Sequence, residues 1–158
     1  MLYFAYGSNL DRTQMLERCV SAKFVCIAKA DGFRLAFTHR SRNRNCGAAD
    51  MVLFKDNEVW GVVYQIDATD VELLDKSEGY RPKRDPEKNS YGRVELHVYG
   101  DGDENHPLAV STYVVVPTKR LDPNPRPSIE YKKLIVDGAR HWRLPEHYIK
   151  QLEAIETQ

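Results

Sequence analysis

The chain has 158 residues, with 23 basic and 23 acidic side chains that give a net charge of zero. This length is typical of one domain, so residues 1–158 are expected to form a single folded unit. A neutral chain argues against general nucleic-acid binding and against a polybasic membrane-surface protein, because both classes need a positive excess. No run of about 18 apolar residues is present, so no membrane span is predicted.

Cysteine and histidine usage bears on compartment and on metal binding. The three cysteines, Cys19, Cys26 and Cys46, form no Cys-x-x-Cys pair, and their odd number fits a reducing, cytoplasmic environment better than a disulfide scaffold. The five histidines have no metal-ligand spacing among themselves or with the cysteines, so no structural metal is expected. The apolar start of the chain lacks a basic segment and is not expected to be a signal peptide.

In the first half of the chain, short apolar runs between turn residues predict strands. We expect them at residues 2–6, 23–30, 33–38, 51–54 and 58–66. Asp31-Gly32 and Lys55-Asp56-Asn57 are turn signals, so the last four of these strands are predicted to form two separate hairpins. Asp11 can cap a short helix over residues 12–18, and the basic, Asn-rich stretch 39–47 is expected to be a loop.

In the second half, helix signals become stronger. We expect a helix that is capped by Asp67 or Thr69 and reaches Glu78, helices at 128–141 and from Pro145 onward, and strands at 91–99 and 108–116. Gly79 stands where glycine commonly ends a helix. The charged segment 80–90 is predicted to be an exposed loop or lid, and the three prolines in 121–127 a stiff connector. Six or seven strands with interspersed helices indicate an α+β fold with a mixed, curled sheet.

The segment Tyr6-Gly7-Ser8-Asn9 lies between a predicted buried strand and a capped helix. Glycine permits a sharp exit from the strand, and the amides that follow can converge on an anion with the positive end of the next helix. The Ser8 hydroxyl can add another donor. An ordinary strand-to-helix turn uses the same residue types, and the motif taken alone favours that simpler interpretation.

Glu78 is the candidate acid or base. It follows Val71, Leu74 and Asp75 at helical spacing, so it lies on the stripe that points inward. Burial and a position in the last helical turn both raise a carboxylate pKa, as general acid/base catalysis near pH 7 requires. The alternative is a frayed helix end with Glu78 in solvent.

Tyrosine hydroxyls and an arginine cluster are weaker candidates. Tyr131 is expected on the apolar face of its helix, where a buried hydroxyl needs a partner, usually a backbone carbonyl. Tyr91 and Tyr113 have the same two interpretations, as core residues or as residues of a polar pocket. The cluster at Arg40, Arg42 and Arg44 could bind anions, although a solvated loop is the simpler interpretation.

Four segments in order resemble the γ-glutamylcyclotransferase family. They are LYFAYGSNL at 2–10, EVWGVVY at 58–64, LDKSEG at 74–79, and YKKLI at 131–135 with Gly138-Ala139. The Tyr-Gly-Ser-Asn opening with a later Glu-Gly is specific to the superfamily, and the Tyr-Lys-Lys segment points toward the enzyme of glutathione metabolism.

The resemblance implies a small mixed β-barrel with flanking helices, often paired as a homodimer. It also implies release of 5-oxoproline from a small γ-glutamyl substrate without a cofactor, with Glu78 as catalytic acid/base. The implied substrate-binding residues are Tyr3, Phe4, Ala5, Tyr6, Gly7, Ser8 and Asn9 after the first strand, with Tyr91 and Tyr131.

Two other functions remain open from the sequence. One is a non-catalytic module that binds a γ-glutamyl or other anionic metabolite. The other is a cyclotransferase for a γ-glutamyl amine or a biosynthetic intermediate, because the thirteen positions from Glu78 to Tyr91 are more than the family likeness leads us to expect. Glu78 favours an enzyme, since a binder of anions gains nothing from a buried carboxylate.

Overall fold

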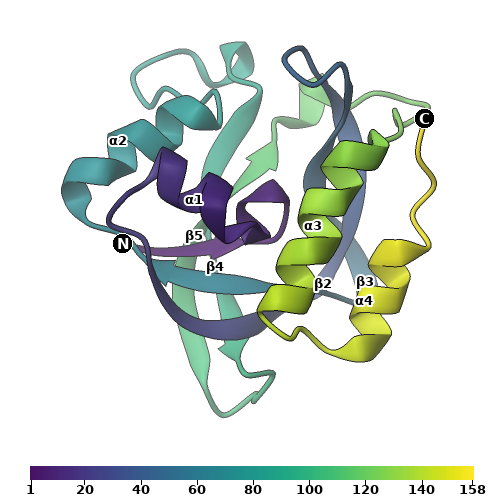
Figure 1. The fold of residues 1–158 in the computed structure, drawn as a ribbon. Helices are drawn as coiled ribbons and strands as arrows, with labels where there is room; N and C mark the ends of the chain where they lie inside the picture. Colours follow the sequence, from purple (N-terminus) through teal and green to yellow (C-terminus); the bar gives the residue numbers. More distant parts are fainter.

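The computed structural model describes all 158 residues and shows a closed five-stranded barrel with four α-helices around it (Figure 1). The strands are β1 (Leu2–Ala5), β2 (Lys23–Ser41), β3 (Cys46–Gln65), β4 (Tyr91–Gly100) and β5 (Pro107–Val115). Their order around the barrel is β1-β3-β2-β4-β5. The β1–β5 pair is parallel and the other pairs are antiparallel, which confirms the predicted mixed β-barrel with flanking helices.

The prediction of two hairpins around Asp31-Gly32 and residues 55–57 is wrong. The four expected strands are two long ones, β2 and β3, which pair from Lys23↔Gln65 to Ser41↔Cys46. The register passes from Asp31↔Glu58 to Phe33↔Leu53, so the two sets of turn residues face each other at an irregularity. Gly32 and Asp56 have positive φ angles of 80° and 61°. Positive φ occurs in strand irregularities such as β-bulges as well as in hairpin turns, so these residue types do not distinguish the two.

The loop predicted over the basic stretch 39–47 is shorter in the structure, because β2 and β3 are longer than expected. Both strands continue into it, and only a tight turn at 42–45 joins them, with Asn45 at φ 51°. This turn and the 80–90 segment both lie at the upper edge of the molecule in the view of Figure 1.

The helices are α1 (Arg12–Arg18), α2 (Ala68–Ser77), α3 (Ile129–His141) and α4 (Glu146–Glu153). Short 3₁₀ turns are η1 (Ser8–Leu10), η2 (Pro86–Lys88) and η3 (Pro117–Lys119). The caps predicted at Asp11 and Ser128 are confirmed, because their side chains accept hydrogen bonds from the amides of Gln14 and Tyr131. None of these helices is long and apolar enough to cross a membrane.

Helix α3 holds η1 against the barrel. A Cβ on Gly138 would lie 2.5–2.7 Å from three atoms of Leu10, so only glycine lets the helix approach this closely. The indole Nε1–H of Trp142, just after α3, donates to the Leu10 carbonyl at 2.9 Å. The C-terminal part of the chain thus fixes the segment that follows β1.

Candidate active site

Glu78 stands at the C-terminal end of α2, with its side chain only 16% exposed. Leu74 and Asp75 on the same helical face are buried, so the predicted inward stripe is confirmed and the frayed, solvent-facing alternative is excluded. Gly79, with φ of 69°, ends the helix in the left-handed conformation that glycine adopts readily. The carboxyl group is therefore held at a defined place against the barrel.

The two oxygens of the Glu78 carboxylate have different surroundings. Oε1 accepts hydrogen bonds from Asn9 Nδ2 at 3.0 Å and from Arg18 at 3.3 Å. Oε2 accepts none from the protein, and it is not sealed off from solvent. One oxygen is thus fixed by the protein while the other is free to meet a substrate proton.

The pKa of Glu78 is raised above that of a free glutamate. Burial disfavours the charged form and is the largest cause; the Arg18 guanidinium and the Asn9 amide act in the opposite direction. Arg44 lowers the pKa further through its charge. A raised pKa moves the proton affinity of this carboxylate toward the range in which a general base works near neutral pH.

Glu78 and the segment after β1 line one small hollow of about 40 Å³. The hollow is lined by Tyr3, Tyr6, Gly7, Ser8, Asn9, Ala49, Glu78, Tyr91, Tyr113 and Tyr131. Gly7 allows a close approach here, since a Cβ would lie 3.1 Å from Ala49 Cβ and one of the two would have to shift. At the start of η1 the amides of Ser8 and Asn9 have no partner within the turn.

Eight of the ten site residues expected from the sequence line this hollow, whereas Phe4 and Ala5 lie in the core. Both are fully buried and neither lines the hollow. The Phe4 carbonyl accepts from Thr112 Oγ1 at 2.7 Å, and the Ala5 carbonyl would be only 2.2 Å from a Cβ on Gly61. In the structure these two residues set the path of β1.

The hydroxyls of Tyr131 and Tyr91 both bind the backbone of Ala49. The Ala49 N–H donates to the Tyr131 hydroxyl oxygen at 3.1 Å, and the Tyr91 hydroxyl donates to the Ala49 carbonyl at 2.7 Å. The expected carbonyl partner is therefore confirmed for Tyr91 and wrong for Tyr131. Burial raises the pKa of Tyr131, so its O–H keeps its proton and can be donated into the hollow.

Sequence reasoning missed a side-chain network from α1 that supports Asn9. The Asn9 Oδ1 atom accepts from Gln14 Nε2 at 3.0 Å and from Arg18 at 2.9 Å, while Gln14 also donates to Ser8 Oγ at 2.7 Å. Gln14 and Arg18 are four residues apart on a helix, which places them on one face. That spacing, directly after the Gly-Ser-Asn segment, is the signal that could have found them.

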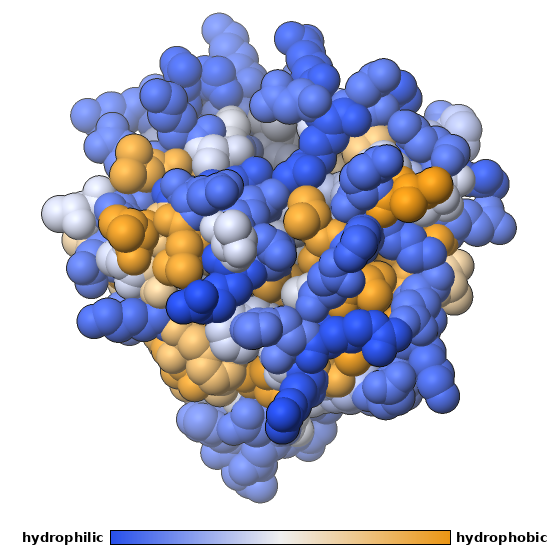
Figure 2. All heavy atoms as spheres, in the orientation of Figure 1, coloured by the Kyte–Doolittle hydropathy of each residue, from blue (hydrophilic) through white to orange (hydrophobic).

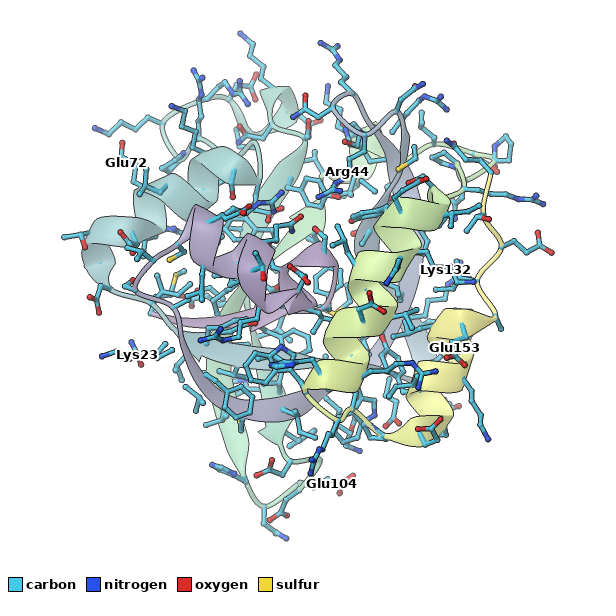
Figure 3. The ribbon with its side chains drawn as sticks, viewed as in Figure 1. Lys23, Arg44, Glu72, Glu104, Lys132 and Glu153 are labelled. Atoms are coloured by element: carbon cyan, nitrogen blue, oxygen red, sulfur yellow. The ribbon has the colours of Figure 1, made fainter.

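Arg44 also joins the site, although the loop that carries it was expected to be solvated. Its guanidinium lies 4.8 Å from the Tyr131 ring centroid and donates to Gln14 Oε1 at 2.5 Å. Figure 3 shows its side chain between α1 and α3. Arg42 lines the cleft outside the hollow, whereas Arg40 bonds to Asn45.

Comparison with known proteins assigns the chain to a family. It is 32% identical to the γ-glutamylcyclotransferases of Mus musculus and Homo sapiens over 159 residues, which is 98% of this chain and 78% of each relative. The chain belongs to the γ-glutamylcyclotransferase family. A model of the AIG2-like family matches residues 58–152. A solved structure of a γ-glutamyl cyclotransferase, 31% identical, superimposes with a TM-score of 0.87 over 100% of this chain and 89% of its own.

Proposed function

We propose that this member of the γ-glutamylcyclotransferase family cyclises a γ-glutamyl compound, releasing 5-oxoproline and a free amine, with Glu78 as general acid/base. The observation that carries the proposal is the Glu78 carboxylate in one hollow with the peptide amides that follow β1. Its Oε2 atom has no protein partner. A base and a set of donors thus face the same small space.

The reaction moves two protons from the attacking nitrogen to the leaving nitrogen. The α-ammonium group of the γ-glutamyl substrate must lose a proton before its nitrogen attacks the γ-carbonyl carbon, and Glu78 takes that proton. Attack forms the C–N bond of the five-membered ring and places a negative charge on the carbonyl oxygen. The original amide C–N bond then breaks as Glu78 gives its proton to the leaving amine. The ring nitrogen releases its remaining extra proton, so that the lactam keeps one N–H and the amine departs as an ammonium ion.

The surroundings of Glu78 suit the other demands of ring closure. Holding the substrate chain folded for an internal attack can contribute about 7–11 kcal/mol in such reactions. Each donor aimed at a developing oxyanion typically contributes about 2.7–4 kcal/mol. The amides of Gly7, Ser8 and Asn9, which donate to no backbone carbonyl, and the Tyr131 hydroxyl are the available donors for the substrate carboxylate and for this oxygen.

We further propose that the enzyme acts in the cytoplasm, in glutathione metabolism, as a homodimer. These assignments rest on family membership and, for the compartment, on the three free cysteines. Light scattering on the purified protein tests the assembly: a mass twice that of the chain is expected, and a monomer at all concentrations would contradict it.

Glu78→Gln is the test of the acid/base assignment. The amide retains the shape of the side chain but accepts no proton, so 5-oxoproline release from γ-glutamyl-alanine should fall by at least about 10²-fold. The matched control is Glu72→Gln on the same helix, because Glu72 is exposed and points away from the barrel (Figure 3). Circular dichroism of both variants verifies the fold.

Two results would contradict the proposal. Normal turnover by Glu78→Gln would remove Glu78 from the mechanism. Absence of 5-oxoproline from every member of a panel of γ-glutamyl amino acids and amines, with retained binding, would favour the non-catalytic binding module instead.

A further inference from the structure

The hollow opens into a wider cleft of about 720 Å³. Ser8, Glu78, Tyr91 and Tyr131 line both spaces, so the two are continuous. If the γ-glutamyl end reacts beside Glu78, as proposed above, the cleft receives the part of the substrate beyond the γ-carbonyl. That part is the leaving amine, and the walls of the cleft determine which amines fit.

The walls of this cleft are strongly cationic. They carry six basic side chains and a single carboxylate, that of Glu78, although the whole chain has 23 charges of each sign. The six are Arg18, Arg42, Arg44, Arg84, Lys88 and Lys119. With His39 neutral, the net charge of the lining is +5. The positive electrostatic potential of such a cleft raises the local concentration of anions.

Five of these six cations have no acidic partner. Among the ten ion pairs of the molecule, only that of Arg18 with Glu78 involves a residue of the cleft. The acidic residues Asp85 and Glu87 lie on the same 80–90 segment as two of the cations, but they do not line the cleft. Asp85 accepts from the Glu87 amide, and Glu87 accepts from the Thr118 hydroxyl.

The six cations come from four segments, and the side chains of two of them, Arg84 and Arg44, are held in place. Arg84 donates to Asn89 Oδ1 at 2.6 and 3.0 Å and to the Gly79 carbonyl at 3.3 Å. Arg44 is fixed over the Tyr131 ring. Donors that are already ordered lose less entropy when they bind an anion. In Figure 2 hydrophilic side chains of the 80–90 segment and the β2–β3 turn form the upper edge, with a recess between them.

We propose that this cleft selects leaving amines that carry at least two negative charges, such as acidic amino acids. A γ-glutamyl amino acid with a neutral side chain brings one carboxylate on each side of the amide that breaks, and most of the five free cations then stay without a partner. A second acidic group on the leaving amine pairs with one or two of them.

The test compares γ-glutamyl-aspartate with γ-glutamyl-asparagine. The two differ by one carboxylate, and free asparagine does not itself yield 5-oxoproline. The kcat/KM for γ-glutamyl-aspartate should exceed that for γ-glutamyl-asparagine by about tenfold. This is the gain expected when one additional carboxylate pairs with two cations that are partly exposed to solvent. Because exposed charges are screened by salt, the ratio should fall toward one at about 1 M NaCl.

The double variant Lys88→Gln/Lys119→Gln should lower this ratio to about twofold. Lys83→Gln is the matched control, since Lys83 is an exposed lysine of the same loop that does not line the cleft. The control should retain the tenfold ratio. If the kcat/KM ratio fell to the same extent in Lys83→Gln, the preference for aspartate would come from the overall charge of the protein surface and not from the cleft, and the proposal would be overturned.

Binding separates this inference from the proposed reaction. In Glu78→Gln, which should not turn over substrate, calorimetry should give a Kd for γ-glutamyl-aspartate about tenfold below that for γ-glutamyl-asparagine. Equal Kd values, or equal kcat/KM values in an active enzyme, overturn the cleft assignment and leave the cyclisation intact. Preferential binding without any 5-oxoproline release supports the cleft and overturns the cyclisation.

Discussion

Among single residues, Arg18 has the most influence on the properties of Glu78. Its guanidinium lies 3.3 Å from Glu78 Oε1 and also bonds Asn9, so it acts on charge and on position together. Burial raises the pKa of Glu78, and Arg18 limits that rise. The two opposing effects together set the proton affinity of this carboxylate.

Arg18→Met should therefore move the acidic limb of the pH dependence of kcat/KM to higher pH. Loss of the positive charge raises the pKa of Glu78 further, so a larger fraction is protonated and unable to act as base at any pH near that value. Initial rates of 5-oxoproline release across the pH range measure the shift. Arg12→Met, on the exposed face of the same helix, is the control, and an unmoved limb in Arg18→Met would refute the electrostatic role.

Among the elements, η1 has the central position because it carries Ser8 and Asn9 between the barrel and the helices α1 and α3. Helix α1 supports it through Gln14, and α3 packs against it where Gly138 meets Leu10. Ala49, which lines the hollow, is followed by the buried Asp50, whose carboxylate accepts hydrogen bonds from Thr38 and Arg120. The site is thus assembled from several elements that are distant in sequence.

Gly138→Ala tests whether α3 positions η1. The new Cβ would lie 2.5 Å from the Leu10 carbonyl carbon, so the helix or η1 must shift. We expect a loss of about 1–3 kcal/mol in the free energy of unfolding, which exceeds the helix-propensity gain of alanine. Turnover should fall with it, because Ser8 and Asn9 move.

Gly92→Ala is the matched control for this substitution. A Cβ there meets nothing within 4 Å, and its φ is not in the left-handed region. Urea denaturation of both variants should show a change only for Gly138→Ala. Equal stability of the two would show that the α3 contact does not hold η1.

At the scale of the whole molecule, barrel and helices share one hydrophobic core. Its 31 buried residues run from Tyr3 in β1 to Leu152 in α4 without a second centre. The N-terminal ammonium group bonds the Ile66 carbonyl, and the Gln158 amide bonds the Pro127 carbonyl. Both ends of the chain are thereby tied to distant segments.

The protein should accordingly unfold in a single transition. Trp60 reports on the barrel and Trp142 on the end of α3, so fluorescence of Trp60→Phe and Trp142→Phe variants follows the two parts separately. Within each variant, the urea midpoint from fluorescence should coincide with that from far-UV circular dichroism. Separate transitions for barrel and helices would contradict a single domain.

The sequence by itself determined the features that depend on near neighbours. Caps at Asp11 and Ser128, the inward face of Glu78 and the helix end at Gly79 follow from residues a few positions apart, whose interactions are local. Only the tertiary structure decided that Asp31-Gly32 lies within one long strand, opposite an irregularity in β3, because such residues serve a turn or a strand irregularity equally well. It alone brought Arg18, Arg44 and Lys88 around one cleft, because charges this far apart in sequence approach only when the barrel closes.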